Sequence, residues 1–214
     1  MNKFFFVSFF LLVIFTSSVD SNPFLDRLFP RKLKSTEKEK VEEIYDYVRK
    51  LHPETLKISQ KSYRKRSQFR NFFGFQFSGP TLLYWLKLRI HDFKIGASNQ
   101  YVANFENGTV YLDPSFFNLS KLEQAVILIH EARHGDGDEF HHVDCPDEFP
   151  FLSIRAPESD LEGIRACDDR IDGAYGLGAA FLFEIFSFGL FPPGRYSEII
   201  GMYNSEMLRI IVKR

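Results

Sequence analysis

SKLEQAVILIHEARHG, residues 120–135, predicts the central element of the fold. Ser120 and Glu123 have the spacing of a capping box, which predicts that a helix begins directly after Ser120. Residues 125–129 are all apolar, so this helix is expected to be buried. The glycine that closes the segment is a typical stop signal, and the predicted helix therefore covers residues 121–134.

Two histidines and a glutamate occupy the C-terminal half of this predicted helix. His130 and His134 are four residues apart, so both imidazoles lie on one helix face and can reach one metal ion. Glu131 directly follows the first histidine, where it can accept a proton from a water molecule that the metal activates. Burying such polar side chains costs free energy unless they are hydrogen-bonded, ion-paired or bound to a metal. The pattern indicates a catalytic Zn²⁺ site.

A catalytic zinc ion normally takes three protein ligands, so the histidine pair requires a third. The residues leave four candidates open, which are His141, His142, Glu162 and Asp172. The two histidines lie in the acidic loop after the helix, and the two carboxylates lie on a later segment. Asp172 stands in the pattern D-x-x-Y-G, which Tyr175 continues.

The H-E-x-x-H motif followed by D-x-x-Y-G resembles the aspzincin (deuterolysin-type) metalloendopeptidases. The resemblance implies that His130, His134 and Asp172 bind zinc. It further implies that Glu131 is the general base and that the Tyr175 hydroxyl stabilises the oxyanion.

Turn and capping signals predict the remaining elements. Asn107-Gly108 lies between two alternating segments and predicts a β-hairpin over residues 101–112. Residues 81–95 fit a helix or a strand. Helical spacing and caps predict three more helices, over residues 37–51, 159–188 and 197–212. We therefore expect an α+β, zincin-like fold in which a small antiparallel sheet packs on the active-site helix and further helices follow toward the C-terminus.

Composition bounds the class of protein. The 214 residues are 44% hydrophobic and 26% charged, which is typical of a globular chain of one domain. Residues 22–100 carry 17 Lys/Arg against 8 Asp/Glu, whereas residues 101–214 carry 9 against 19. The acidic half would repel phosphate, so nucleic acid is not an expected partner.

The first 21 residues have the layout of a secretory signal peptide. A positive start is followed by an apolar run over residues 4–15 and then by small residues. This run is shorter than the roughly 20 residues of a membrane span, so no stable membrane span is expected. The protein is predicted to be secreted or periplasmic. The signal peptide is followed by a loose basic lead-in over residues 22–35 and then by a catalytic domain over residues 36–214.

Cys145 and Cys167 are the two cysteines of the chain. In an oxidising compartment an even pair predicts one disulfide bond. A Cys metal ligand is the weaker alternative, because neither cysteine belongs to a C-x-x-C motif.

These features predict a secreted zinc-dependent endopeptidase with Glu131 as the general base. The acidic loop over residues 136–148 suggests a peptide or protein substrate that is basic. Two alternatives stay open. The first is a zinc amidase that acts on cell-wall peptide. The second is a non-catalytic secreted binding protein whose basic, Phe-rich segment 56–77 contacts a membrane or a polyanion.

Overall fold

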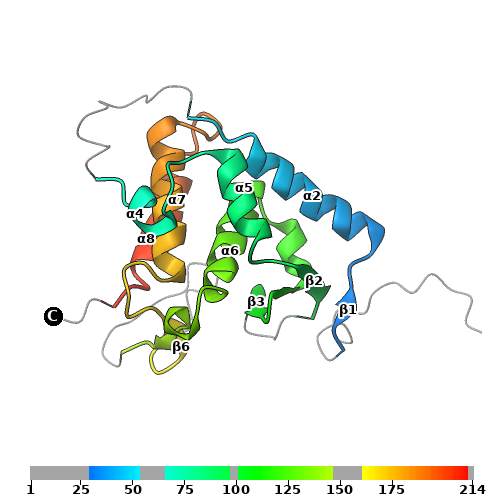
Figure 1. The fold of residues 1–214 in the computed structure, drawn as a ribbon. Coiled ribbons are helices and arrows are strands. Elements are labelled where there is room, and N and C mark those ends of the chain that lie inside the picture. Colours follow the sequence, from blue (N-terminus) through cyan, green and yellow to red (C-terminus); the bar gives the residue numbers. More distant parts are fainter. Residues whose placement is uncertain (1–28, 54–65, 97–100, 147–160, 212–214) are drawn as a thin grey trace, which may run out of the picture.

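The computed structural model describes residues 29–53, 66–96, 101–146 and 161–211. The main sheet and strand β6 lie toward the same end of a layer of helices (Figure 1). The α-helices are α2 (Ser35–Arg49), α4 (Phe69–Phe73), α5 (Gly79–Lys87), α6 (Lys121–His134), α7 (Ala174–Phe188) and α8 (Tyr196–Met207), and the short 3₁₀ helices are η1 (Pro114–Asn118) and η2 (Asp138–Phe140). The strands are β1 (Arg31–Lys32), β2 (Asp92–Ile95), β3 (Ala103–Glu106), β4 (Thr109–Leu112), β5 (Val143–Asp144) and β6 (Arg165–Cys167).

Some sequence predictions fall on other parts of the chain. The predicted signal peptide, most of the basic stretch within residues 56–77 and the predicted helix start at Ser159 lie outside the described residues. Within the described ranges, no helix has the length and hydropathy that crossing a membrane requires.

The main sheet is mixed, with the strand order β1-β2-β4-β3. The expectation of an antiparallel sheet is wrong for one pair, because β2 and β4 run parallel. The chain passes from β2 to the sheet edge, forms β3, and returns as β4 between the two. Residues 31–32 of the predicted loose lead-in pair with β2 and so belong to the sheet.

The predicted hairpin is confirmed as β3 and β4. Asn107 and Gly108 both have positive φ, 49° and 80°, which is the backbone that a two-residue hairpin turn requires. The ambiguous residues 81–95 contain both structures, because α5 ends at Lys87 and β2 begins at Asp92.

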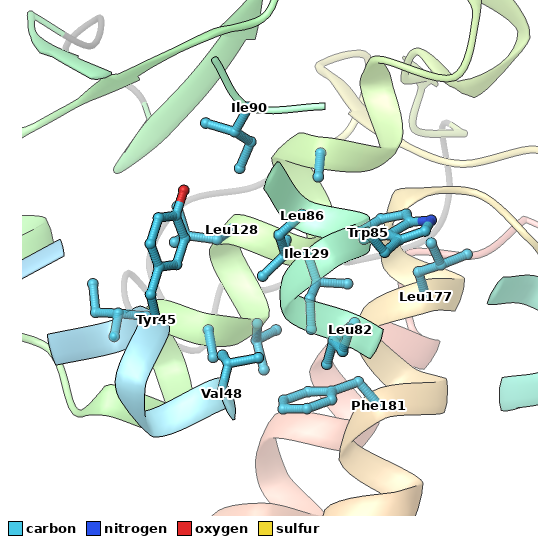
Figure 2. Packing of buried hydrophobic residues seen from close by; sticks show 14 of the residues in the cluster. Tyr45, Val48, Leu82, Trp85, Leu86, Ile90, Leu128, Ile129, Leu177 and Phe181 are labelled. Carbon is cyan, nitrogen blue, oxygen red and sulfur yellow. The ribbon is translucent and has the colours of Figure 1, made fainter. Parts of the chain in front are cut away.

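The core surrounds the apolar half of α6. Leu128 and Ile129 are fully buried. Side chains of three other helices surround them in Figure 2, namely Tyr45 and Val48 of α2, Leu82 and Leu86 of α5, and Leu177 and Phe181 of α7. Four of the five residues 125–129 are buried, which confirms the prediction, and Ile127 is partly buried and lines a cleft. This burial also fixes the position of the polar C-terminal half of the helix.

The predicted helix over residues 159–188 is wrong before residue 174. The part that begins at Leu161 turns and then forms β6, which pairs antiparallel with β5. A disulfide bond joins Cys145 and Cys167, as predicted, and holds this segment extended beside β5. Helix α7 begins only after Gly173.

We call residues 141–146 and 161–168 the β5–β6 unit. Cys145 and Cys167 belong to a small hydrophobic cluster of this unit that is separate from the main core. The C-terminal segment after α8 attaches to the unit, since the Asp168 N–H donates to the Arg209 carbonyl at 2.8 Å and the Ile211 N–H donates to the Asp168 carbonyl at 2.7 Å.

Candidate metal centre

Helix α6 presents His130 and His134 side by side. Its start is the predicted capping box, in which the Glu123 N–H donates to the Ser120 hydroxyl at 3.3 Å and the Ser120 N–H donates to the Glu123 carboxylate at 2.9 Å. The two imidazole rings lie one turn apart, with centroids 5.2 Å from each other. This part of the predicted site is therefore formed by local helix geometry.

His142 from the β5–β6 unit joins the pair. The Nε2 atoms of His130 and His142 are 3.0 Å apart. One ligand atom from each of His130, His134 and His142 lies within 4.8 Å of the others, so the three can hold one metal ion. Three imidazole nitrogens around one point suit zinc well, although the same donors also bind other transition metals.

Hydrogen bonds at the other ring nitrogen orient two of these rings. His134 Nδ1 lies 2.8 Å from the carbonyl oxygen of Phe140, and His142 Nδ1 lies 2.8 Å from a carboxylate oxygen of Asp168. Each Nδ1 therefore carries the proton, which leaves the Nε2 lone pair free for a metal. Burial lowers the pKa of His130 well below its ordinary value and that of His134 to about 4, so both rings are neutral at pH 7.

Arg133 stabilises the loop that supplies the Phe140 carbonyl. Its guanidinium lies 3.6 Å from the centre of the Phe140 ring, a cation–π contact. The same group donates to the Asp136 carboxylate at 2.7 Å and to the backbone carbonyl of Asp172 at 2.9 Å. The side chain between the two helix histidines thus ties their helix to the loop and to the start of α7.

Asp172 does not join the histidines, contrary to the prediction that it is the third zinc ligand. Its carboxylate forms ion pairs with Arg170 at 3.0 Å and with Arg133 at 3.4 Å. The prediction placed Asp172 and Tyr175 on one helix, whereas α7 begins at Ala174 and leaves Asp172 in the preceding turn. Of the four candidates, the structure brings His142 to the pair.

The other two candidates do not join the group. His141 stacks on His134, with ring centroids 5.3 Å apart, and its Nε2 lies 3.8 Å from an Asp138 carboxylate oxygen. Glu162 is exposed, and its backbone forms an isolated bridge with Cys145.

Glu131 and Tyr175, the predicted general base and oxyanion stabiliser, line the same cleft as the three histidines. Glu131 is 6% exposed, and burial raises the pKa of its carboxyl to about 8. The Tyr175 ring lies 4.5 Å from the His130 ring and 5.0 Å from the His142 ring, measured between centroids. Burial also raises the pKa of the Tyr175 phenol, so its hydroxyl keeps its proton and can donate a hydrogen bond.

A cleft of about 820 Å³ opens onto these groups. Its lining comes from residues 101–105 at β3, from α6, and from residues between Glu198 and Arg209. The three histidines, Glu131 and Tyr175 all line it. The volume falls in the range of sites that bind a small ligand or a short peptide segment.

Sequence reasoning assigned no role to Asp168 or Arg209, although the predicted disulfide was expected to bring residues 168–172 close to the histidine pair. Asp168 follows directly after the disulfide cysteine, and Arg209 lies near the end of the chain. No sequence spacing connects either residue with the H-E-x-x-H motif. Both residues come close to the histidines only because β5 pairs with β6.

Comparisons of the chain with protein-family models, with curated proteins and with solved structures found no match.

Proposed function

We propose that the protein is a secreted zinc-dependent peptidase that hydrolyses internal peptide bonds. The observation that carries the proposal is the group of His130, His134 and His142, with Glu131 buried next to it in the same cleft. Compared with the aspzincin pattern, the proposal keeps four of the five implied site residues and puts His142 in the place of Asp172.

The roles follow from the chemistry of the side chains. When bound, zinc supplies a Lewis acid that polarises the peptide carbonyl and activates a water molecule. In the metal-free cleft burial raises the pKa of the Glu131 carboxyl, and the two positive charges of a bound zinc ion would lower it again, so that the carboxyl is ionised. The carboxylate accepts the proton of the attacking water as the water oxygen bonds to the carbonyl carbon, and then delivers the proton to the amide nitrogen as the C–N bond breaks. The Tyr175 hydroxyl donates a hydrogen bond to the oxygen that becomes negatively charged.

The β3 edge supports an extended peptide as the substrate. Among the described strands, β3 pairs only with β4, and its residues line the cleft. An extended chain can add to such an edge through backbone hydrogen bonds, which suits peptides of varied sequence. The disulfide is compatible with an oxidising compartment and so with secretion.

Metal analysis and digestion of an unbiased peptide library test this function together. We expect about one zinc per chain and cleavage within the peptides by the zinc-loaded protein. Glu131→Gln should keep the zinc and the thermal stability while turnover falls by ~10²–10⁴-fold, the usual effect of losing a general base.

Two results would contradict the proposal. One is a zinc-loaded protein that cleaves no peptide of the library. The other is a Glu131→Gln variant that retains more than about a tenth of the wild-type activity, because a general base cannot be that dispensable. A protein that binds no metal would favour the alternative of a non-catalytic binding protein.

A further inference from the structure

Two arginines line the cleft close to the three histidines. Arg165 donates from Nε to the backbone carbonyl of His142 at 2.7 Å, and Arg209 donates from Nη1 to the backbone carbonyl of Ala166 at 3.1 Å. Neither arginine forms an ion pair with a carboxylate among the described residues. Each guanidinium has five N–H donors, so most of them stay available to a ligand.

Arg209 lies near the tyrosine expected to stabilise the oxyanion. Its guanidinium carbon lies 5.6 Å from the centre of the Tyr175 ring, and the His130 ring packs against the same tyrosine. Arg209 is also half-buried, whereas Arg165 is exposed. A charge at that position is screened less by water and acts more strongly on a ligand in the cleft.

A guanidinium at this place is electrostatically costly beside a zinc site. Zinc would add two positive charges to the same cleft, where like charges repel each other. Glu131 and Glu206 in the cleft lining offset part of this repulsion. An anionic group on the ligand would relieve that repulsion and accept two parallel hydrogen bonds from the guanidinium. Arg209 therefore favours a substrate that carries a negative charge close to the bond that is cleaved.

The acidic loop does not oppose such a substrate. The Asp136 carboxylate pairs with Arg89 at 2.7 Å and with Arg133. Asp138 and Glu139 line an adjoining hollow of about 280 Å³, which shares His141, His142 and Arg165 with the cleft. Asp147 and Glu148 lie outside the described residues. The described carboxylates of the acidic loop therefore do not line the cleft. The carboxylates that do line it are those of Glu123, Glu131, Glu198 and Glu206.

We propose that Arg209, assisted by Arg165, binds a carboxylate of the substrate next to the scissile bond. The inference rests on the proposed peptidase function and narrows its substrates to peptides with a carboxylate at this position. Beside an internal scissile bond the carboxylate is an Asp or Glu side chain. A C-terminal carboxylate presents the same two oxygens to a guanidinium, and cleavage next to it would make the protein a carboxypeptidase instead of the endopeptidase proposed above.

Matched peptides distinguish these sources. One pair ends in a free carboxylate or in an amide close to the cleavage site, and the other pair has Asp or Asn at an internal position. We expect kcat/KM to be about 10- to 100-fold higher for the charged member of at least one pair, as for the loss of a charge-assisted hydrogen bond. Equal cleavage of both members in both pairs would overturn the inference.

Substitution of Arg209 assigns the effect to this residue. Arg209→Gln should abolish the preference through a higher KM for the charged peptide, Arg209→Lys should keep part of it, and zinc content should not change. Arg49→Gln, at the exposed end of α2, is the charge-matched control and should keep the full preference. If Arg209→Gln keeps the preference, or lowers kcat equally for charged and uncharged peptides, the residue does not bind a substrate carboxylate.

A binding measurement separates this inference from the proposed function. Calorimetry measures the binding of two pairs of acetylated tripeptides to the zinc-loaded protein. The members of the first pair differ by a free C-terminus or a C-terminal amide, and those of the second pair differ only by Asp or Asn. Should the library show no peptidase activity, tighter binding of a charged member that is lost in Arg209→Gln still supports the carboxylate site. Equal binding within both pairs refutes it.

Discussion

His142 faces the candidate metal centre with Nε2, which lies 3.0 Å from His130 Nε2, while its Nδ1 is bonded to Asp168. Asp172, the ligand expected from the D-x-x-Y-G pattern, is neutralised by two arginines instead. An aspartate that left Arg133 and Arg170 to bind zinc would abandon charge-assisted hydrogen bonds. Asp172 therefore cannot bind the metal and keep its ion pairs with Arg133 and Arg170 at the same time, whereas His142 needs to give up no such contact.

His142→Ala should weaken zinc binding by more than about 100-fold, because losing a ligand costs more than losing one of the groups that orient it. Asp172→Ala should leave the affinity nearly unchanged. Competition with a chromophoric chelator measures both. His141→Ala is the matched control, since this imidazole stacks on His134 without joining the group. Zinc loss in Asp172→Ala, with zinc retained in His142→Ala, would restore the aspartate as the third ligand.

The element that decides the site is the β5–β6 pair. It places His142 before β5 and Asp168 after β6, so one short ladder brings a ligand and its hydrogen-bond partner together. The second carboxylate oxygen of Asp168 accepts from the Tyr175 N–H at 2.9 Å, at the first turn of α7. Asp168 is 3% exposed and thus connects the third ligand with the helix that carries the tyrosine.

Asp168→Asn tests this connection. An amide has only one carbonyl oxygen, so either His142 or the Tyr175 N–H loses its acceptor. We expect zinc affinity to fall by about 10- to 100-fold, as for other groups that orient metal ligands. Asp169→Asn, at the exposed neighbouring position, should change little. The fall should vanish in a His142→Ala background; a persistent fall would mean that Asp168 acts on the fold in general and not through His142.

Local signals account for the elements that the sequence could predict. The capping box at Ser120 and the Asn107-Gly108 turn each act over a few residues, and both are present in the structure. The pair His130 and His134 follows from helix geometry alone. These parts need no information about the rest of the chain.

Long-range pairing accounts for what the sequence could not predict. β6 is extended because it pairs with β5 and is joined to it by the disulfide, although residues 161–173 have helical spacing. The parallel pairing of β2 with β4 depends on where the hairpin inserts in the sheet. The choice of His142 among four candidate ligands depends on the same kind of contact.

Across the whole molecule, the metal centre joins two separately packed regions. The main core holds α6 with its two histidines, whereas the β5–β6 unit has its own small cluster around Cys145 and Cys167. His142 links that unit to α6 at the centre, and backbone hydrogen bonds from Asp168 attach it to the C-terminal segment. A metal bound by all three histidines should therefore stabilise the contact between the two regions.

Zinc removal should loosen the β5–β6 unit. A ligand that binds only the closed form stabilises it by about 2.7 kcal/mol when its free concentration is 100 times its Kd, equivalent to roughly 100-fold fewer openings. Amide hydrogen exchange of peptides from residues 141–146 and 161–168 should accordingly become faster after chelation, by up to that factor. In His142→Ala the same treatment should have little effect, because the unit no longer contributes a ligand. Exchange in this unit that is unchanged by zinc in the wild-type protein would mean that His142 is not bound to the metal in solution.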